Sequence, residues 1–460
     1  MNQINKFRKE ITKKKKALAF IICLFIILTY FLFNFENLSM FIDSDIHAYT
    51  QNVEQGRLVN MFNPHHLLFD YSGFLFYKAT ENIGNLSADA LFNQRIKSLL
   101  VASLGAGLIF LFLFFLSGRI FLSLIFTGFI VFARGYISYA GLNDTPLIHT
   151  VLCILLFFTL YYYNKVKYKF LFVILLAVFH SVTVFFHQAN ALFYPVIIFF
   201  ILNCYKNVSL KKRLIHSIAY TFFLIFIVGG MYFYVGLFII KTSLFGGENL
   251  AYFGIKGTGN FFNWLSFYAH QGVWGAGHEG QSLNKILYGI SGAVVRGISF
   301  IRYKENYFDL TNFFQEKYAA LNVMFVFMVS FTVLYILLIK KLYKKYGPVI
   351  LALALWFVIY LTFFSWWEPE YFEFWLITVS TFFIMIFFVF DYLLDLVKEK
   401  FIIKISVNTI AYTLIFLCFI ILAGHNYYYV VYPRSKNVKF GWIGKYKERI
   451  MKRNFRMMYK

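Results

Sequence analysis

The chain has 460 residues, of which 60% are hydrophobic and only 14% are charged. A soluble domain needs about a quarter of its residues charged, so this composition excludes a soluble globular protein and predicts an integral membrane protein. The formal net charge of +23 is spread over short basic clusters between apolar runs. Membrane topology produces that pattern, whereas a nucleic-acid partner would require a folded basic domain, so no nucleic acid is expected as a partner.

Apolar runs of about 17 to 25 residues, each long enough to cross roughly 30 Å of hydrocarbon as a helix, recur along the chain. The first run, 17–35, follows a basic segment but ends without a small-residue cleavage site, which indicates an uncleaved anchor and not a signal peptide. The positive-inside rule then places residues 1–16 in the cytoplasm and the acidic segment 36–96 outside. Further spans are expected over 97–116, 120–133, 145–163, 170–186, 189–204 and 214–240.

A second long outer segment, 241–318, is rich in Gly, Trp and His, and its stretch 286–301 is interrupted by Arg296, which favours an interfacial helix over a span. The last spans are expected over 319–339, 348–364, 371–390 and 403–423. A total of about eleven spans leaves the basic tail, 425–460, outside; because this opposes the positive-inside rule, a miscount by one helix is the open alternative. The predicted fold class is all-α and polytopic, with a transmembrane domain over 17–424 between two basic tails.

Two carboxylates, Asp43 and Asp45, come soon after the first span, where the chain leaves the membrane. At this spacing they can share a site, in which one acts as a general base and the other orients it or holds a divalent cation. The alternative is a pair of solvated acids in an acidic outer loop. We therefore take Asp43 and Asp45 as candidate catalytic residues and as candidate ligands of Mg²⁺ or Mn²⁺.

Adjacent histidines, His65 and His66, follow a proline in the same outer segment. Neighbouring residues on a helix point about 100° apart, so the pair is poorly placed to hold one metal ion together. One of them can instead bind a phosphate oxygen or assist proton transfer while the other caps or packs. A purely structural role for this dipeptide is the equal alternative.

An aromatic and acidic stretch over 365–375 joins the ninth and tenth expected spans on the same face. Trp367 offers a flat surface for a sugar or prenyl group, and Glu368 can meet hydroxyl groups. An ordinary interfacial aromatic belt, followed by a helix that begins at Pro369, explains the same residues. Arg134 outside the third span and His187 outside the fifth add polar groups to this face.

The expected inner loops hold little but Lys and Arg, so a site on the outer face is favoured over a path through the membrane. Transporters usually place ionisable residues in the middle of their spans. His149 and His180 are the obvious candidates of that kind, and each is also explained as a packing residue with satisfied hydrogen bonds.

These motifs resemble the lipid-dependent glycosyltransferases of the GT-C fold, such as protein O-mannosyltransferases and aminoarabinose transferases. An acidic motif in a large first outer loop is typical of that family, and Asp43-Ser44-Asp45 stands in that place. The stretch Asn63-Pro64-His65-His66-Leu67-Leu68-Phe69, the helix start Asp144-Thr145-Pro146 and the Trp-Trp-Glu-Pro connection are similar to further motifs of its members.

The resemblance implies a sugar donor on a polyprenyl phosphate and an acceptor hydroxyl on a glycan, a lipid or a protein. Asp43 or Asp45 would deprotonate that hydroxyl, which would attack the anomeric carbon with inversion while the lipid phosphate leaves. Candidates for supporting the phosphate charge are Arg57, His65, His66 and Arg134. The second outer segment, with Trp264, His270, Trp274 and His278, would cover the cavity and exclude water.

Two other classes of function stay open on the sequence alone. A lipid-glycan flippase, a polymerase or another transporter would need a polar path between helices. A membrane scaffold without turnover would need none of the polar motifs to act together. In every case the basic tail, 425–460, is expected to contact anionic membrane lipids.

Overall fold

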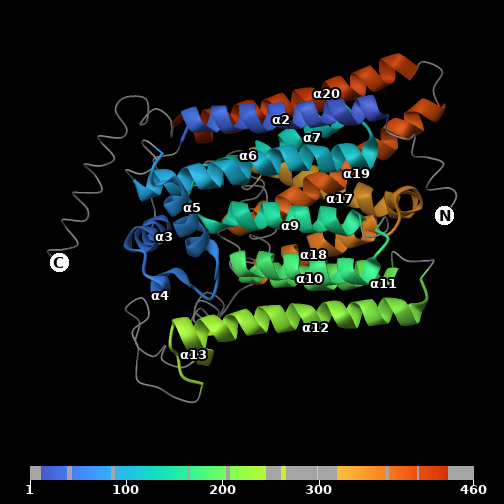
Figure 1. Cartoon of the computed structure of the whole chain (residues 1–460). Helices are drawn as coiled ribbons and strands as arrows, with labels where there is room; N and C mark the ends of the chain where they lie inside the picture. The colour runs from blue at the N-terminus through green and yellow to red at the C-terminus, as the bar shows by residue number, and fades with distance from the viewer. Residues whose placement is uncertain are drawn as a thin grey trace.

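The computed structural model describes residues 12–38, 44–83, 89–162, 166–203, 208–244, 261–265, 298, 319–367, 372–400 and 404–433. Within this part of the chain every named element is a helix. The long helices lie side by side with roughly parallel axes, and the short helices of the first outer segment group at one end of them (Figure 1). This arrangement satisfies the backbone inside each helix, as a hydrocarbon solvent requires.

In the N-terminal half, the first long helix is followed by the short helices of the first outer segment and then by the rest of the bundle. Its elements are α2 (Lys13–Glu36), α3 (Ser44–Gln55), α4 (Leu58–Met61), α5 (Phe69–Thr80), α6 (Ala90–Ser117), α7 (Ile120–Val131), α8 (Arg134–Tyr139), α9 (Thr145–Tyr162), α10 (Lys169–Phe186), η3 (Gln188–Phe193) and α11 (Tyr194–Asn203). The elements that follow are α12 (Leu210–Tyr234), η4 (Val235–Ile239), α13 (Phe261–Leu265), α17 (Ala319–Tyr346), α18 (Val349–Trp367), η8 (Phe372–Trp375), α19 (Leu376–Lys400), α20 (Lys404–Asn426) and η9 (Tyr427–Val431).

Seven of the described helices are long and apolar enough to cross a membrane: Lys13–Glu36, Ala90–Ser117, Lys169–Phe186, Leu210–Ile239, Val326–Tyr346, Leu376–Leu396 and Thr409–Val431. Four shorter apolar helices accompany them: Ile120–Val131, Thr145–Tyr161, Gln188–Asn203 and Val349–Ser365. The multi-pass helical membrane fold predicted from the sequence is confirmed. The count of eleven spans stays a prediction, because the four other apolar helices are too short to be identified as spans by length.

Several helix boundaries differ from the sequence prediction, for example in α19, which spans Leu376–Lys400 and not 371–390. Two of the differences have a clear local reason. α6 begins at Ala90 and not near residue 97, because the Asp89 side chain caps it by accepting the backbone N–H of Leu91 at 2.9 Å. α17 continues to Tyr346 and not to residue 339, and it stops where Gly347 adopts a positive φ of 73°. Hydropathy marks the lysines near its end as the limit of the span, but the helix itself extends past that limit.

Phenylalanine rings pack against one another between several of the helices. Phe129 of α7 stacks on Phe383 of α19 with ring centroids 5.3 Å apart, and Phe126 meets Phe387 edge-on at 5.6 Å. Gly128 lets α20 approach α7, since a Cβ at that position would lie 2.5 Å from the ring of Phe419. Large apolar side chains are also exposed on the outer helix faces, as expected where lipid is the solvent.

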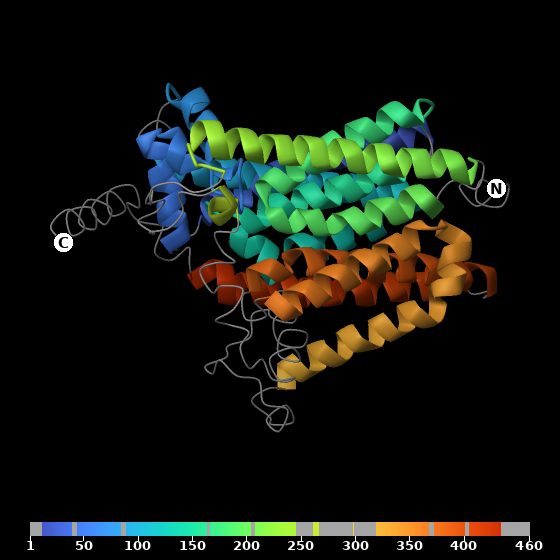
Figure 2. The same cartoon turned by 90° about the horizontal axis from the view of Figure 1, so that it is seen from below.

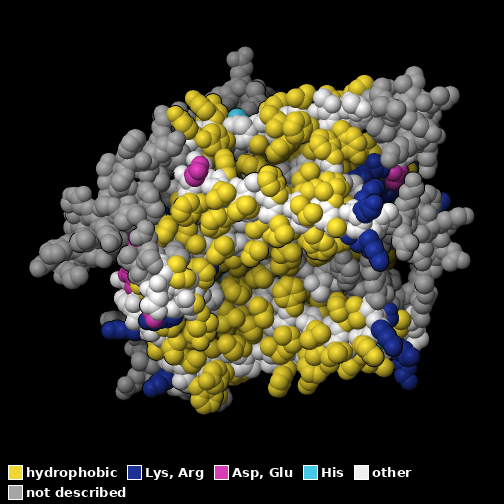
Figure 3. Space-filling model, turned by 45° about the horizontal axis from the view of Figure 1, so that its top comes forward, with side chains coloured by type: hydrophobic (Ala, Val, Ile, Leu, Met, Phe, Trp, Pro, Cys, Tyr) yellow, Lys and Arg dark blue, Asp and Glu magenta, His cyan; other side chains and the backbone are white. Residues whose placement is uncertain are grey.

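Lys and Arg side chains gather mainly at one end of the bundle (Figure 3). We call it the basic end, and its described members include Lys13, Arg119, Lys169, Lys211 and Lys345. The opposite end, called the loop end, is formed by α3, α4, α5 and the turn between α10 and η3. The positive-inside rule assigns the basic end to the cytoplasm, and this orientation stays a prediction.

Candidate functional site

The first feature of the loop end is α3, which sequence analysis treated as a loop. Ile46, Thr50 and Val53 are buried on one face of this helix, at the spacing of an amphipathic helix. Asp45 stands in its first turn with an exposed side chain, where a carboxylate is favoured by the helix dipole. Asp43 lies outside the described residues.

The half-buried Tyr49 connects α3 to the histidine pair. Its hydroxyl lies 3.0 Å from His66 Nε2, and the two rings meet edge-on with centroids 4.9 Å apart. On the buried face, Thr50 Oγ1 accepts a hydrogen bond of 3.3 Å from Asn143 Nδ2, just before α9. α3 is therefore held at two points, and Asp45 stands one helical turn before the first of them.

His65, His66 and His187 come together although His187 is far from the pair in sequence. The ring centroids of His65 and His187 are 4.3 Å apart, and those of His187 and His149 are 4.7 Å apart in a stacked arrangement. All four side chains are buried. Sequence analysis singled out the first three for a site and named His149 only as a mid-span residue. We call these four residues the histidine cluster.

Backbone hydrogen bonds lock the two histidine-bearing segments to each other. The N–H of Gln188 donates to the carbonyl of His65, and the N–H of Leu68 donates to that of Phe185, both at 2.9 Å. Tyr232 of α12 supports the same loop by donating to the carbonyl of Pro64 at 2.7 Å. The cluster therefore rests on rigid elements and not on a free loop.

Asn190 orients the part of the cluster that faces the bundle. Its Oδ1 lies 3.3 Å from His149 Nδ1, and its Nδ2 donates to the carbonyl of Thr183 at 2.7 Å. Its own carbonyl lies 2.8 Å from His180 Nε2, and the other ring nitrogen of His180 is hydrogen-bonded to Tyr220. His180 is therefore satisfied by its neighbours, which favours the packing interpretation of this residue.

Burial keeps His65, His66 and His187 neutral. Desolvation lowers the pKa of His65 to about 4 and, together with the neighbouring His65, that of His66 to about 3. Desolvation and then the nearby histidines lower the pKa of His187 well below its ordinary value. Near neutral pH these rings are uncharged, so they can take part in hydrogen bonds but do not carry a fixed positive charge for a phosphate group.

Two buried ring nitrogens of the cluster, His66 Nδ1 and His149 Nε2, have no hydrogen-bond partner in the described structure. An unpaired buried polar atom costs free energy, which a bound ligand would recover. Within the described part of the chain, no group of three or more His, Cys, Asp or Glu side chains is arranged to hold a metal ion. Because Asp43 is not among the described residues, the cation site predicted at Asp43 and Asp45 stays a prediction.

The remaining predicted site residues are spread around this end. Arg57 is exposed at the start of α4, and Arg134 is half-buried at the start of α8. Trp367 ends α18, with its side chain outside the description, and Glu368 lies outside the described residues. Their predicted roles in binding stay predictions.

The second outer segment touches the loop end through α13. Trp264 of α13 is fully buried in an apolar cluster that also contains Leu67 and Phe185, directly beside the histidine-bearing segments. The other residues expected to cover the site, His270, Trp274 and His278, lie outside the described residues. α13 therefore packs beside the segments that carry His65 and His187.

A buried carboxylate that sequence analysis missed fastens α3 to the bundle. Asp70 of α5 accepts a hydrogen bond of 2.7 Å from Asn52 of α3. Desolvation raises the pKa of Asp70 to about 7, while Asn52 and the cation of Lys97 oppose that rise. Gln94 of α6 donates to the carbonyl of Gly73 at 2.8 Å. An acid directly after Leu-Leu-Phe, at the start of an apolar segment, was the available signal.

Comparison with known proteins gives a fold and no close relative. No family model matches the sequence, and no curated protein matches it. ArnT from Cupriavidus metallidurans, solved bound to undecaprenyl phosphate, is 11% identical, with a TM-score of 0.50 over 82% of this chain and 60% of ArnT. The archaeal oligosaccharyltransferase AglB from Archaeoglobus fulgidus, solved with an inhibitory peptide and a dolichol-phosphate, is 14% identical, with a TM-score of 0.51 over 92% of this chain and 56% of AglB.

The chain thus spans little more than half the length of these two proteins. At such low identity the likeness is one of fold alone, and it agrees with the architecture predicted from the sequence. This chain has the helical membrane fold that ArnT and AglB share, the GT-C fold.

Proposed function

We propose that this chain is a membrane glycosyltransferase that moves a sugar from a polyprenyl-phosphate donor to a hydroxyl acceptor. Its fold is shared with ArnT, which was solved with undecaprenyl phosphate, and with AglB, an oligosaccharyltransferase solved with a dolichol-phosphate. A fold alone does not define chemistry. The observation that carries the proposal is the exposed carboxylate of Asp45, held by a rigid helix one turn from the Tyr49–His66 hydrogen bond.

The proposed reaction needs one base and one site for a departing phosphate. Asp45, or Asp43 beside it, takes the proton of the acceptor hydroxyl, and the oxygen attacks the anomeric carbon of the sugar. The bond from that carbon to the phosphate oxygen breaks, and its electron pair leaves with the lipid phosphate. Attack from the opposite side inverts the configuration at the anomeric carbon.

Neutral His66 suits the phosphate part of this scheme as a hydrogen-bond donor. When the Tyr49 hydroxyl donates to His66 Nε2, the single N–H of the neutral ring lies on Nδ1, which is buried without a partner in the described structure. His149 donates from Nδ1 to Asn190 Oδ1, so its unpaired Nε2 is an acceptor and cannot donate to the phosphate. A fixed charge must then come from elsewhere, and the half-buried Arg134 is our candidate for it. The acceptor is a glycan, a lipid or a protein, and the reaction takes place at the loop end, on the extracytoplasmic face.

The catalytic assignment is tested by removing each carboxylate separately. Asp43→Asn and Asp45→Asn are assayed in membrane vesicles for transfer of labelled sugar from a polyprenyl-phosphate donor. We expect at least one variant to lose transfer by about 100-fold or more, the lower range for removing a general base. Glu54→Gln, which changes an exposed acid on the same helix, is the matched control and should keep full activity.

Membrane insertion is measured alongside, by extraction yield and thermal unfolding, so that lost activity is not confused with lost folding. If both aspartate variants transfer sugar at the rate of the unmodified protein, the carboxylates are not the base and the proposed mechanism is wrong.

A further inference from the structure

An apolar groove lies between α7, α17, α19 and α20, away from the histidine cluster. Its volume is about 310 Å³, and every lining side chain is apolar or a cysteine. Its walls are marked by Phe129 of α7, Phe331 of α17, Phe383 of α19 and Leu414 of α20. Leu414 is 57% exposed, so the groove reaches the outer surface of the bundle.

The shape of the groove follows from the path of α17. Figure 2 shows α17 meeting the other helices near the basic end and standing off α19 and α20 towards its N-terminal end. Protein interiors rarely contain voids larger than a water molecule, and an apolar cavity does not hold water. A groove of this size and lining in a membrane span therefore calls for an apolar occupant.

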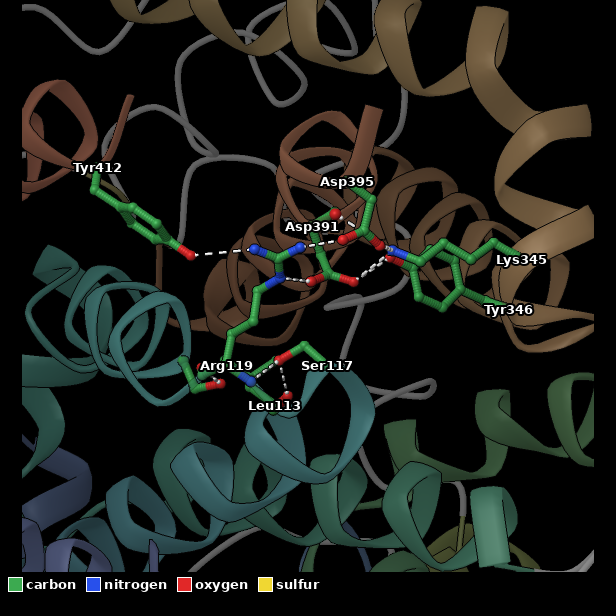
Figure 4. A network of polar contacts seen from close by, with 9 residues as sticks. Leu113, Ser117, Arg119, Lys345, Tyr346, Asp391, Asp395 and Tyr412 are labelled. Atoms are coloured by element: carbon green, nitrogen blue, oxygen red, sulfur yellow. Dashed lines mark hydrogen bonds and ion pairs between the residues drawn. The ribbon is translucent and has the colours of Figure 1, made fainter. Parts of the chain in front are cut away.

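A polar network lies next to the groove at the basic end (Figure 4). Arg119 Nε lies 2.7 Å from Asp391 Oδ1, and Lys345 Nζ lies 2.8 Å from the other oxygen of that carboxylate. Asp395 also pairs with both cations, and Tyr412 accepts a hydrogen bond from the Arg119 guanidinium. These residues come from the same four helices that line the groove.

The network also marks the depth at which the apolar region ends. Phe390 and Ala411 line the groove, and their chain neighbours Asp391 and Tyr412 belong to the network. An occupant chain therefore lies in the hydrocarbon on one side of this level, and any polar group attached to it lies at or beyond the network.

Exposed lysines stand at the matching level on α17. Lys340, Lys341 and Lys344 are exposed in its last turns. Phe331 and Lys341 are separated by ~15 Å along the helix, at about 1.5 Å of rise per residue. That length is about half of the roughly 30 Å hydrocarbon core, or one leaflet. Lysines near a membrane surface attract anionic head groups.

We propose that this groove binds one acyl chain of an anionic phospholipid from the leaflet at the basic end, with its head group beside Lys341 and Lys344. The acyl chain fills the gap between α17 and α20, and the phosphate of the head group contacts the lysines. The groove shares no lining residue with the histidine cluster, which lies at the opposite end of the bundle. The site is therefore distinct from the one assigned to a polyprenyl-phosphate donor, and it stands whether or not the chain transfers a sugar.

The test uses the full chain in lipid vesicles that contain phosphatidylglycerol with a photoreactive group near the end of one acyl chain. After illumination, labelled residues are mapped by mass spectrometry. We expect labelling of the groove segments of α17 and α20 to exceed labelling of the exposed face of α12 at Phe222 by at least about fivefold. The same probe with a phosphatidylcholine head group should label the groove several-fold less.

Two sets of variants separate the parts of the site. Ala411→Phe places a ring in the groove and should reduce its labelling at least about fivefold, whereas Leu417→Phe, exposed on the same helix outside the groove, should not. Changing Lys341 and Lys344 together to glutamine should remove the preference for phosphatidylglycerol while keeping the chain contact.

Competition on the unmodified protein keeps the proposal testable if a variant fails to fold. Unlabelled phosphatidylglycerol should displace the probe. Equal labelling of the groove and of Phe222, or displacement by a polyprenyl phosphate but not by phosphatidylglycerol, would overturn the proposal.

Discussion

Replacing His66 by glutamine tests how the buried histidine cluster responds to acid. The pKa of His66 is about 3 in the folded protein, against an ordinary value of 6.5. As the pH falls through 6.5, the unfolded chain takes up a proton that the folded protein does not, so stability is lost on acidification. At about 1.36 kcal/mol for each pH unit, the loss from His66 alone between pH 7.5 and 5.0 is about 2 kcal/mol.

The glutamine variant keeps a polar side chain but has no group that titrates in this range. At pH 7.5 it should be less stable than the unmodified protein by about 1 kcal/mol, because the bond between Tyr49 and the imidazole is lost. At pH 5.0 it should be more stable by about 1 kcal/mol, because the acid penalty of about 2 kcal/mol is absent. The difference between the two proteins therefore changes sign with pH.

Thermal unfolding of the detergent-purified protein at the two pH values measures this difference. His425→Gln, a histidine change outside the cluster, serves as the control and should leave the acid response of the unmodified protein in place. A stability difference between the His66 variant and the unmodified protein that is the same at pH 7.5 and pH 5.0 would refute the inference that His66 is buried and neutral.

Two further pairs of substitutions test the packing that supports the site and the groove, each by thermal unfolding. Gly73→Ala should destabilise the protein by on the order of 1–3 kcal/mol, since the added Cβ would lie 2.3 Å from Gln94 Oε1. The Cβ of Gly229→Ala would meet nothing within 4 Å, so this change should stabilise α12 by about 0.5–1 kcal/mol. Asp391→Asn removes a carboxylate that is only 4% exposed and leaves the half-buried Arg119 and Lys345 with Asp395 alone, so it should cost about 3 kcal/mol. Asp395→Asn, at a side chain 44% exposed, should cost under about 1 kcal/mol. Equal effects within either pair would contradict the structure.

The long helices were predictable because the bilayer imposes a rule on each segment separately. α9 begins at Thr145 as expected, and α10 covers nearly the predicted residues. Length, hydropathy and backbone satisfaction are local properties, so no knowledge of neighbours is needed. The same rule fails at α17, because hydropathy reports where the hydrocarbon ends and not where the helix ends.

The first outer segment was less predictable. The carboxylate Asp45 was singled out, but the helix that carries it was not, although Ile46, Thr50 and Val53 have helical spacing. The buried pair of Asn52 and Asp70 escaped notice because an acid in an outer loop is expected to be solvated. Its role depends on α3 packing against α5, which no local pattern encodes.

The sequence by itself determined that this is a multi-pass helical membrane protein, with the fold of ArnT and AglB and with its polar motifs placed towards one face. Only the tertiary structure decided that His149 joins His65 and His187, and that burial makes the cluster neutral. The physical reason is that the length and hydropathy of a span are properties of one helix, whereas ring contacts and desolvation depend on which helices become neighbours. The groove beside α17 was also decided only by the tertiary structure, since four helices separated in sequence must meet to form it.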